Sequence, residues 1–234
     1  MNNPDLYAIW ANLGISFQVE QEQLSAPEEA ILQTIRYGQF PKDRKLFSLM
    51  LLWLEQYSEY IHVERLQRMI KELPSHELAL LGGLCLKIRK QKKDHRFDSP
   101  LKKIRKRLGE HSPSFPSLSD HPFFIQRHGL DTEFEKFGIK VAQLNAADQK
   151  KILSEEQLLG KNLWLFHRCM FGVNFRADVA TIINLYSPKN GYQAAKLARC
   201  STNSGYGHWR ALMKVDWMRS KEVYEGLSSK NLVI

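Results

Sequence analysis

The chain has 234 residues, of which 43% are hydrophobic and 25% charged, the composition of a folded globular protein and not of a disordered or membrane-spanning one. Its formal net charge of +9 favours a partner that carries phosphates or other anions. The longest apolar run, 49–54, is far shorter than the roughly 20 residues of a membrane helix, and the first residues lack the pattern of a signal peptide. We therefore expect a cytoplasmic protein with no membrane partner.

Helical signals dominate the first 110 residues. Residues 25–29 combine a capping serine, a proline and two acids, all of which favour the start of a helix. Apolar residues at helical spacing then predict helices over 46–57 and 63–73, and another helix that begins at Ser75. We predict a helical N-terminal domain over residues 1–110.

The end of this domain carries most of the excess charge. Eleven cations and two acids fall within residues 87–107, and we name the eleven cations the basic stripe. We expect the basic stripe to bind phosphates; the alternative is a solvated helix face or charged linker. The basic stripe consists of Lys87, Arg89, Lys90, Lys92, Lys93, Arg96, Lys102, Lys103, Arg105, Lys106 and Arg107.

A cluster of prolines and serines at 111–120 predicts a loop, and we place a domain boundary there. Residues 111–150 are interpreted as a linker followed by an aromatic connecting segment, and residues 151–234 as a C-terminal domain.

No recognised pattern of catalytic or metal-binding residues occurs. The histidines lack the spacing of a zinc protease, and no serine lies in a nucleophile turn. We interpret Arg176 and Asp178 as an ion pair near a helix start, and His167 as a hydrogen-bonded core residue. The scattered cysteines form no disulfide framework or zinc site, and we expect them to be reduced core thiols: Cys85, Cys169 and Cys200. No catalytic residue, metal or cofactor is predicted.

Three helices are predicted near the C-terminus: one over 175–186, one from Gln193, and one that begins after the capping residue Ser201. The last two fit a helix-turn-helix, whose second helix enters the major groove of DNA. The residues expected to face inward are Ala194, Ala195, Leu197, Ala198, Trp209 and Leu212.

The polar outer face of the last helix and the cations that follow it are the predicted DNA contacts. They are Thr202, Asn203, Ser204, Tyr206, His208, Arg210, Lys214, Arg219 and Lys221. Arg199 occupies the turn position that usually holds glycine, and Gly205 and Gly207 each disfavour a helix by roughly 1 kcal/mol relative to alanine. These glycines either permit close backbone approach or mean that the helix orders only on binding. Residues 215–234 are expected to form a two-stranded wing.

The phrases KNLWLFHRCMFGVNFRADVATIINL and GYQAAKLARCSTNSGYGHWRALMKVD resemble the winged helix-turn-helix module of bacterial regulator-like proteins associated with nucleotidyltransferases and toxin–antitoxin systems. The resemblance covers roughly residues 155 to 225. It implies a mainly α fold with a small β wing, DNA binding, and an antitoxin-like role beside a nucleotidyltransferase. Because no glycine-serine pair is followed by spaced acids, nucleotidyltransferase activity itself is not expected.

We therefore expect a DNA-binding protein without enzymatic activity, either a transcriptional regulator or an antitoxin-like autoregulator. We expect a homodimer, because symmetric half-sites strengthen a weak single contact. The N-terminal helices are the candidate dimer or partner surface. One alternative is a protein partner of a nucleotidyltransferase or another acidic protein, without sequence-specific DNA binding. Another is RNA binding by the basic stripe, with the C-terminal unit as a scaffold.

Overall fold

The computed structural model describes residues 5–38, 40–109 and 114–215. Within these ranges every regular element is a helix, apart from two isolated β-bridges, so the prediction of a mainly α fold is confirmed. None of these helices combines the length and the apolar character that crossing a bilayer requires. The wing predicted after residue 214 falls, except for Val215, outside the described residues.

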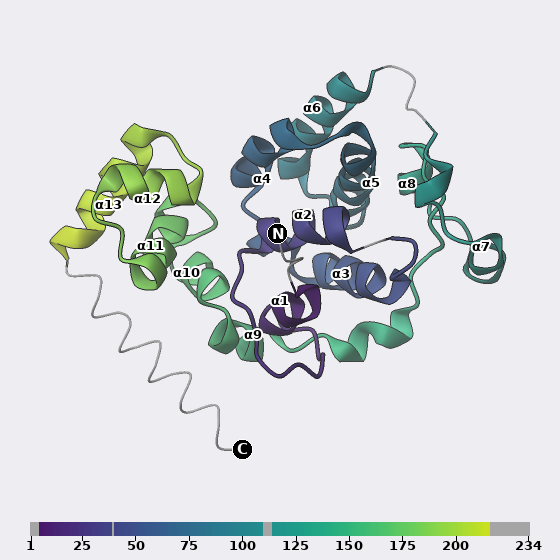
Figure 1. The fold of residues 1–234 in the computed structure, drawn as a ribbon, viewed down its shortest axis with the longest axis horizontal. Coiled ribbons are helices and arrows are strands. Elements are labelled where there is room, and N and C mark those ends of the chain that lie inside the picture. The colour runs from purple at the N-terminus through teal and green to yellow at the C-terminus, as the bar shows by residue number, and fades with distance from the viewer. Residues whose placement is uncertain (1–4, 39, 110–113, 216–234) are drawn as a thin grey trace.

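An N-terminal body and a C-terminal group of helices lie beside one another (Figure 1). The N-terminal body contains α1 (Leu6–Asn12), α2 (Pro27–Tyr37), α3 (Arg44–Tyr57), α4 (Val63–Met69), the 3-10 turn η2 (Ile70–Glu72), α5 (Ser75–Gln91) and α6 (Asp98–Leu108). It is followed by α7 (Pro122–His128), α8 (Thr132–Glu135) and α9 (Glu155–Lys161). The C-terminal group contains α10 (Leu163–Phe171), α11 (Phe175–Tyr186), α12 (Gly191–Ala198) and α13 (Thr202–Lys214).

Side-chain caps set where several helices begin. Asp43 and Ser201 each accept a hydrogen bond from the backbone amide three residues further on, at 3.1 and 3.2 Å, which satisfies one of the free amides of the first turn. The predicted capping role of Ser25 is wrong, because the residue before the helix is Ala26 and no side chain caps it. The start of α2 relies instead on Pro27 and the acids behind it.

Two tryptophans lie at the centre of the N-terminal body. Trp10 and Trp53 are fully buried and meet edge to face, with ring centroids 5.6 Å apart. Both indole N–H groups are satisfied, since Trp10 donates to the hydroxyl of Thr34 at 2.7 Å and Trp53 to the carbonyl of Leu13 at 2.6 Å. Their burial joins α1, α2 and α3 in one core.

The aromatic connecting segment is part of the same core. The rings of Phe134 and Phe137 lie against Gly83 and Gly82 of α5, where an added Cβ would approach them to 2.3 and 2.4 Å. Glycine inside a helix is unfavourable, and here the contact with two buried rings explains it. Part of the aromatic connecting segment is therefore a packed layer over α5.

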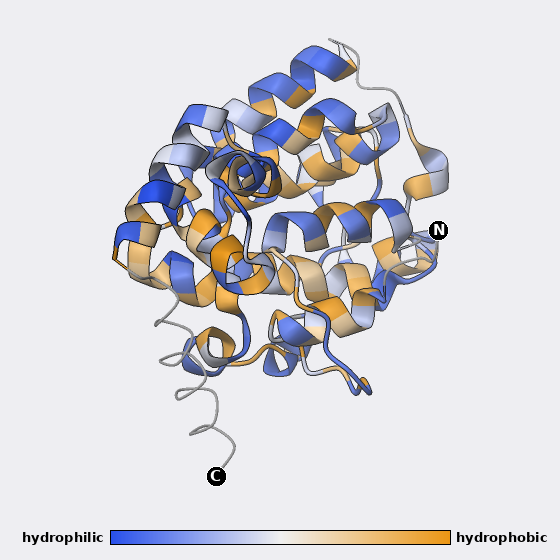
Figure 2. Ribbon diagram, turned by 60° about the vertical axis from the view of Figure 1, so that its left-hand side comes forward, coloured by the Kyte–Doolittle hydropathy of each residue, from blue (hydrophilic) through white to orange (hydrophobic). Residues whose placement is uncertain are grey.

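The C-terminal group has a second, smaller core. Its members are Ala26, Trp164, Val179, Ala180, Ile182, Ile183, Ala194, Ala198 and Leu212. Ala26 comes from the N-terminal body, and Leu165 of α10 belongs to the larger core, so the two cores adjoin. Figure 2 shows the hydrophobic and hydrophilic bands that alternate along these ribbons, as expected for amphipathic helices.

A cluster of charged side chains joins the two parts. Arg168 of α10 donates to both carboxylate oxygens of Glu28 at 2.8 Å and to Asp178 at 2.9 and 3.0 Å. His62 and Arg65 lie 2.7 and 3.5 Å from the same Asp178. All five residues are buried, and we name them the interdomain ion cluster. It ties α10 and α11 to the N-terminal body.

The predicted ion pair between Arg176 and Asp178 is wrong, because Asp178 points into the interdomain ion cluster. Arg176 is exposed and lies over the ring of Phe171, 5.4 Å from its centroid. Burial by itself raises the pKa of Asp178, but the charge of Arg168 and the hydrogen bond from His62 hold that pKa well below its ordinary value. The carboxylate is therefore ionised, and its charge is balanced inside the protein.

Candidate nucleic-acid interface

Helices α11, α12 and α13 form a three-helix unit in which a short turn separates α12 from α13. Arg199 in this turn has a φ of 55°, the left-handed conformation that glycine adopts most readily. Its guanidinium lies 3.4 Å from Glu29 and 3.7 Å from Glu72 of the N-terminal body. Arg65 donates to the carbonyl of Ala198 at 3.3 Å. Contacts with the N-terminal body thus hold the turn in place.

Glycines allow α12 and α13 to cross closely. A Cβ on Gly205 would lie 2.3 Å from the Cβ of Ala195, and one on Gly191 would lie 2.6 Å from the Cα of Tyr206. Gly207 has open space around it. Close approach therefore accounts for Gly205, whereas Gly207 makes no contact that requires a glycine.

The inward face matches the prediction except at one position. Ala194, Ala195, Ala198 and Leu212 are buried; Trp209 is partly buried and packs against the smaller core. The prediction that Leu197 faces inward is wrong, since this side chain is 37% exposed. Successive side chains point about 100° apart around a helix. The Leu197 side chain therefore points to one side of the face that the three alanines form.

The predicted contact residues of α13 divide by exposure. Ser204 and His208 are partly buried, and Arg219 and Lys221 lie outside the described residues. Burial, and then the charge of Arg176, lower the pKa of His208, so its imidazole is neutral near neutral pH. The exposed members are Thr202, Asn203, Tyr206, Arg210 and Lys214.

The surface charge of the unit has one sign. Residues 163–215, all of which the structure describes, contain seven lysines and arginines and a single acid, Asp178. Because Asp178 and Arg168 are buried together, this stretch exposes cations and no carboxylate. The net charge of the whole chain obscures this segregation, because outside residues 87–107 and 163–215 the acids outnumber lysines and arginines by six and cancel the excess of this stretch. The surface cations are Arg176, Lys189, Lys196, Arg199, Arg210 and Lys214.

The basic stripe separates into structural and solvent-facing members. Lys87 is buried, with its ammonium 2.7 Å from Asp131 and 3.3 Å from Glu55, so the prediction that it binds phosphate is wrong. Arg107 donates to the carbonyls of Ile70 and Leu73.

Other members of the basic stripe are also engaged. Arg96 donates to the carbonyls of Ser58 and Glu59, each at 3.2 Å, and pairs with Asp94. Arg89 and Lys90 pair with acids, and Lys103 donates to Gln67. The members that are exposed and form neither an ion pair nor a side-chain hydrogen bond with any described residue are Lys92, Lys93, Lys102, Arg105 and Lys106.

The residues considered for catalysis lie apart. His167 is buried, its Nδ1 lies 2.9 Å from the hydroxyl of Thr181, and burial lowers its pKa to about 4. Cys85 is buried and Cys200 partly buried, but Cys169 is exposed, so the prediction of a core position for Cys169 is wrong. No group of three His, Cys, Asp or Glu side chains within the described ranges could hold a metal ion.

Comparison of the chain with protein-family models, curated proteins and solved structures finds no match. The function is therefore inferred from the geometry and charge of α11–α13 and of the surface around α5 and α6.

Proposed function

We propose that the protein binds DNA through α13, as a transcriptional regulator or an antitoxin-like autoregulator. One observation carries the proposal: the three-helix unit presents a polar face on α13, and residues 163–215 expose cations and no carboxylate of their own. A phosphate backbone repels exposed carboxylates, and their absence from residues 163–215 favours close approach to DNA. The sequence resemblance to winged helix-turn-helix regulators agrees with this proposal.

Base contacts would come from the exposed side chains at the start and centre of α13. Asn203 can form two hydrogen bonds with adenine, and Arg210 two with guanine. Lys214, Lys196 and Arg176 carry the positive charge that positions the helix on phosphates. A dimer would place two such helices on the half-sites of one operator.

The test is selection of duplexes from a random pool, followed by gel shifts with the selected duplex and with the DNA upstream of the gene. Asn203→Ala and Arg210→Ala each remove one base contact, and we expect each to weaken selective binding by about 1–3 kcal/mol, roughly 5- to 150-fold. Gln126→Ala and Arg127→Ala on α7, at positions that are also exposed, are the matched controls. Selective binding that survives both α13 substitutions, or no selected sequence at all, would overturn the proposal.

A protein partner is the second candidate, and exposed apolar side chains on the same unit favour it. Tyr192 is 64% exposed, Tyr206 50% and Met213 46%, and such side chains are enriched in protein interfaces. The partner would be an acidic protein, such as a nucleotidyltransferase encoded beside this gene. Co-purification with that gene product, reduced by Tyr192→Ser and unaffected by Asn203→Ala, together with no DNA shift at low salt, would favour this candidate.

A further inference from the structure

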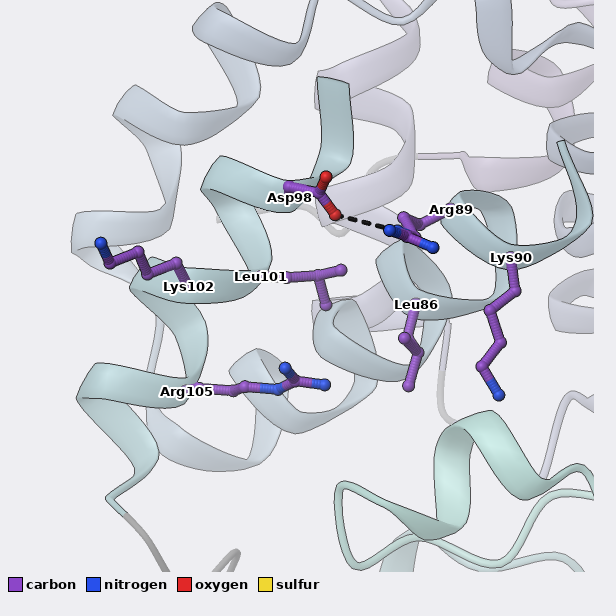
Figure 3. A pocket seen from close by; sticks show the side chains of 7 residues that line it. All are labelled: Leu86, Arg89, Lys90, Asp98, Leu101, Lys102 and Arg105. Carbon is purple, nitrogen blue, oxygen red and sulfur yellow. Dashed lines mark hydrogen bonds and ion pairs between the residues drawn. The ribbon is translucent and has the colours of Figure 1, made fainter. Parts of the chain in front are cut away.

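An open cleft of about 370 Å³ lies between the C-terminal end of α5 and helix α6. Figure 3 shows Arg105 extending from α6 toward α5, with Leu86 and Leu101 between the two helices. Both leucines are almost completely buried, so they form the floor. Arg89, Lys90 and Lys102 complete the walls.

Cations outnumber acids in this cleft. Asp98 is the acid of the lining, and it is already engaged by Arg89 at 2.9 Å and His95 at 3.0 Å. Lys102 and Arg105 are exposed and have no ion-pair partner in the described part of the chain. The lining therefore has a positive charge that its own carboxylate does not neutralise.

A further cation stands beside the cleft. Lys90 pairs with Glu133 at 2.7 Å, yet it also lies close to Lys136 of the neighbouring turn. A side-chain hydrogen bond with Lys90, and then the positive charge of the same ammonium group, lower the pKa of Lys136. Cations near a helix C-terminus offset its dipole, which accounts for Arg105 in the last turn of α6 but not for Lys102 or Lys136.

The arrangement suits an extended polyanion better than a single phosphate. The cleft is open, and its cations continue along α6 with Lys106 and past the end of α5 with Lys92 and Lys93. A single phosphate is held best by side chains that converge on it in a concave, preformed site. A row of exposed cations instead matches the evenly spaced charges of a nucleic-acid backbone.

We propose that the α5–α6 cleft binds the phosphodiester backbone of nucleic acid, as a contact area separate from α13. Helix α4 lies between the two areas, because Lys103 of α6 donates to Gln67 of α4, and Arg65 and Arg68 of α4 contact Ala198 and Phe175 of the C-terminal group. The two areas are therefore at least one helix diameter, about 10 Å, apart. This inference does not depend on sequence-specific reading by α13.

The test uses the full-length protein, fluorescence anisotropy and a labelled duplex of arbitrary sequence, about 30 base pairs long, over about 50–200 mM salt. We expect the double variant Lys102→Glu, Arg105→Glu to reduce the slope of log affinity against log salt by about 2 and the affinity at the lowest salt by about 100-fold. The double variant Lys42→Glu, Lys45→Glu makes the same charge change at exposed positions near the start of α3 and is the control. Circular dichroism melts check that all variants fold.

Each outcome decides a separate question. A wild-type salt slope in the cleft variant, or an equal loss in the control, would overturn the cleft as a backbone site. Displacement of the duplex from the wild-type protein, but not from the cleft variant, by inorganic phosphate at matched ionic strength would point to a free phosphate ligand and would also overturn it. Loss of selective binding on Asn203→Ala with an intact cleft bears on α13 alone.

Discussion

Gly205 and Ala195 meet where α13 crosses α12, and a Cβ added to Gly205 would lie 2.3 Å from the Cβ of Ala195. That separation is below any tolerable contact between two carbons, so the crossing has no room for a side chain. The position of α13 on the unit depends on this contact, and with it the direction in which Asn203 and Arg210 face.

The glycine pair of α13 provides a matched test of this crossing. Gly205→Ala is expected to destabilise the protein by about 1–3 kcal/mol through overpacking. Gly207→Ala, in open space on the same helix, is expected to stabilise it by up to about 1 kcal/mol through helix propensity. Thermal denaturation measures both, at about 2–4 °C per kcal/mol for a chain of this size. Equal effects of the two substitutions would contradict the crossing geometry.

Removing the central cation of the interdomain ion cluster leaves two buried carboxylates, Glu28 and Asp178, with a single arginine, Arg65, beside them. Arg168→Met is expected to lower the free energy of unfolding by about 3–5 kcal/mol. The control Arg176→Met, at an exposed position beside Phe171, is expected to lower it by less than about 1 kcal/mol. Urea denaturation near neutral pH gives both values. A mild effect of Arg168→Met would mean that water reaches the cluster.

Stability is expected to fall in mild acid because of His167. Burial lowers its pKa to about 4, against about 6.5 for an unfolded histidine, so the unfolded state binds the proton first. The contribution is fully present above pH 6.5 and is lost as the pH falls toward about 4, at up to about 1.4 kcal/mol per pH unit. Asp178, whose pKa is lowered, contributes stability that is lost only at more acidic pH, below the unfolded Asp value of about 3.9.

Denaturation of His167→Gln over this pH range isolates the first effect. The variant should lose the part of the slope between pH 6.5 and 4 that comes from this side chain. His76→Gln, at an exposed histidine, should retain the wild-type slope. An unchanged slope in the His167 variant would assign the acid sensitivity to other groups.

Two lysines of the basic stripe are expected to behave in opposite ways. Lys87→Gln leaves Asp131 without its buried partner and should lower stability by about 1–3 kcal/mol without changing the salt dependence of nucleic-acid binding. Lys102→Gln should change stability by less than about 0.5 kcal/mol and reduce the salt slope by about 1. Denaturation and anisotropy on the same samples separate the structural role of Lys87 from the phosphate-binding role of Lys102. A reduced salt slope in the Lys87 variant would contradict this assignment.

Local signals in the sequence predicted the parts of the fold that local interactions determine. The cap at Ser201 and the burial of the alanines of α12 follow from capping chemistry and helical periodicity, which act over one or two turns. The left-handed turn at Arg199 was also placed correctly, although the residue there is not glycine.

Contacts between distant segments lie beyond such signals. Lys87 has the helical neighbours of a basic surface, and only its pairing with Asp131, far along the chain, shows that it is buried. Asp178 has a nearby arginine in sequence, yet its partner His62 is 116 residues away. The sequence also does not show that residues 163–215 expose cations and no carboxylate, because the exposure of a carboxylate depends on the whole fold.

The interdomain ion cluster also bears on how this protein can be dissected. A fragment that begins at α10 would keep Arg168 and Asp178 but lose Glu28, His62 and Arg65. Arg168 would keep its pair with Asp178 but would lose its two hydrogen bonds to Glu28, and the turn at Arg199 would lose both of its acidic neighbours. Work on the three-helix unit therefore requires the first helices of the chain, supplied either in the same polypeptide or as a complementing fragment.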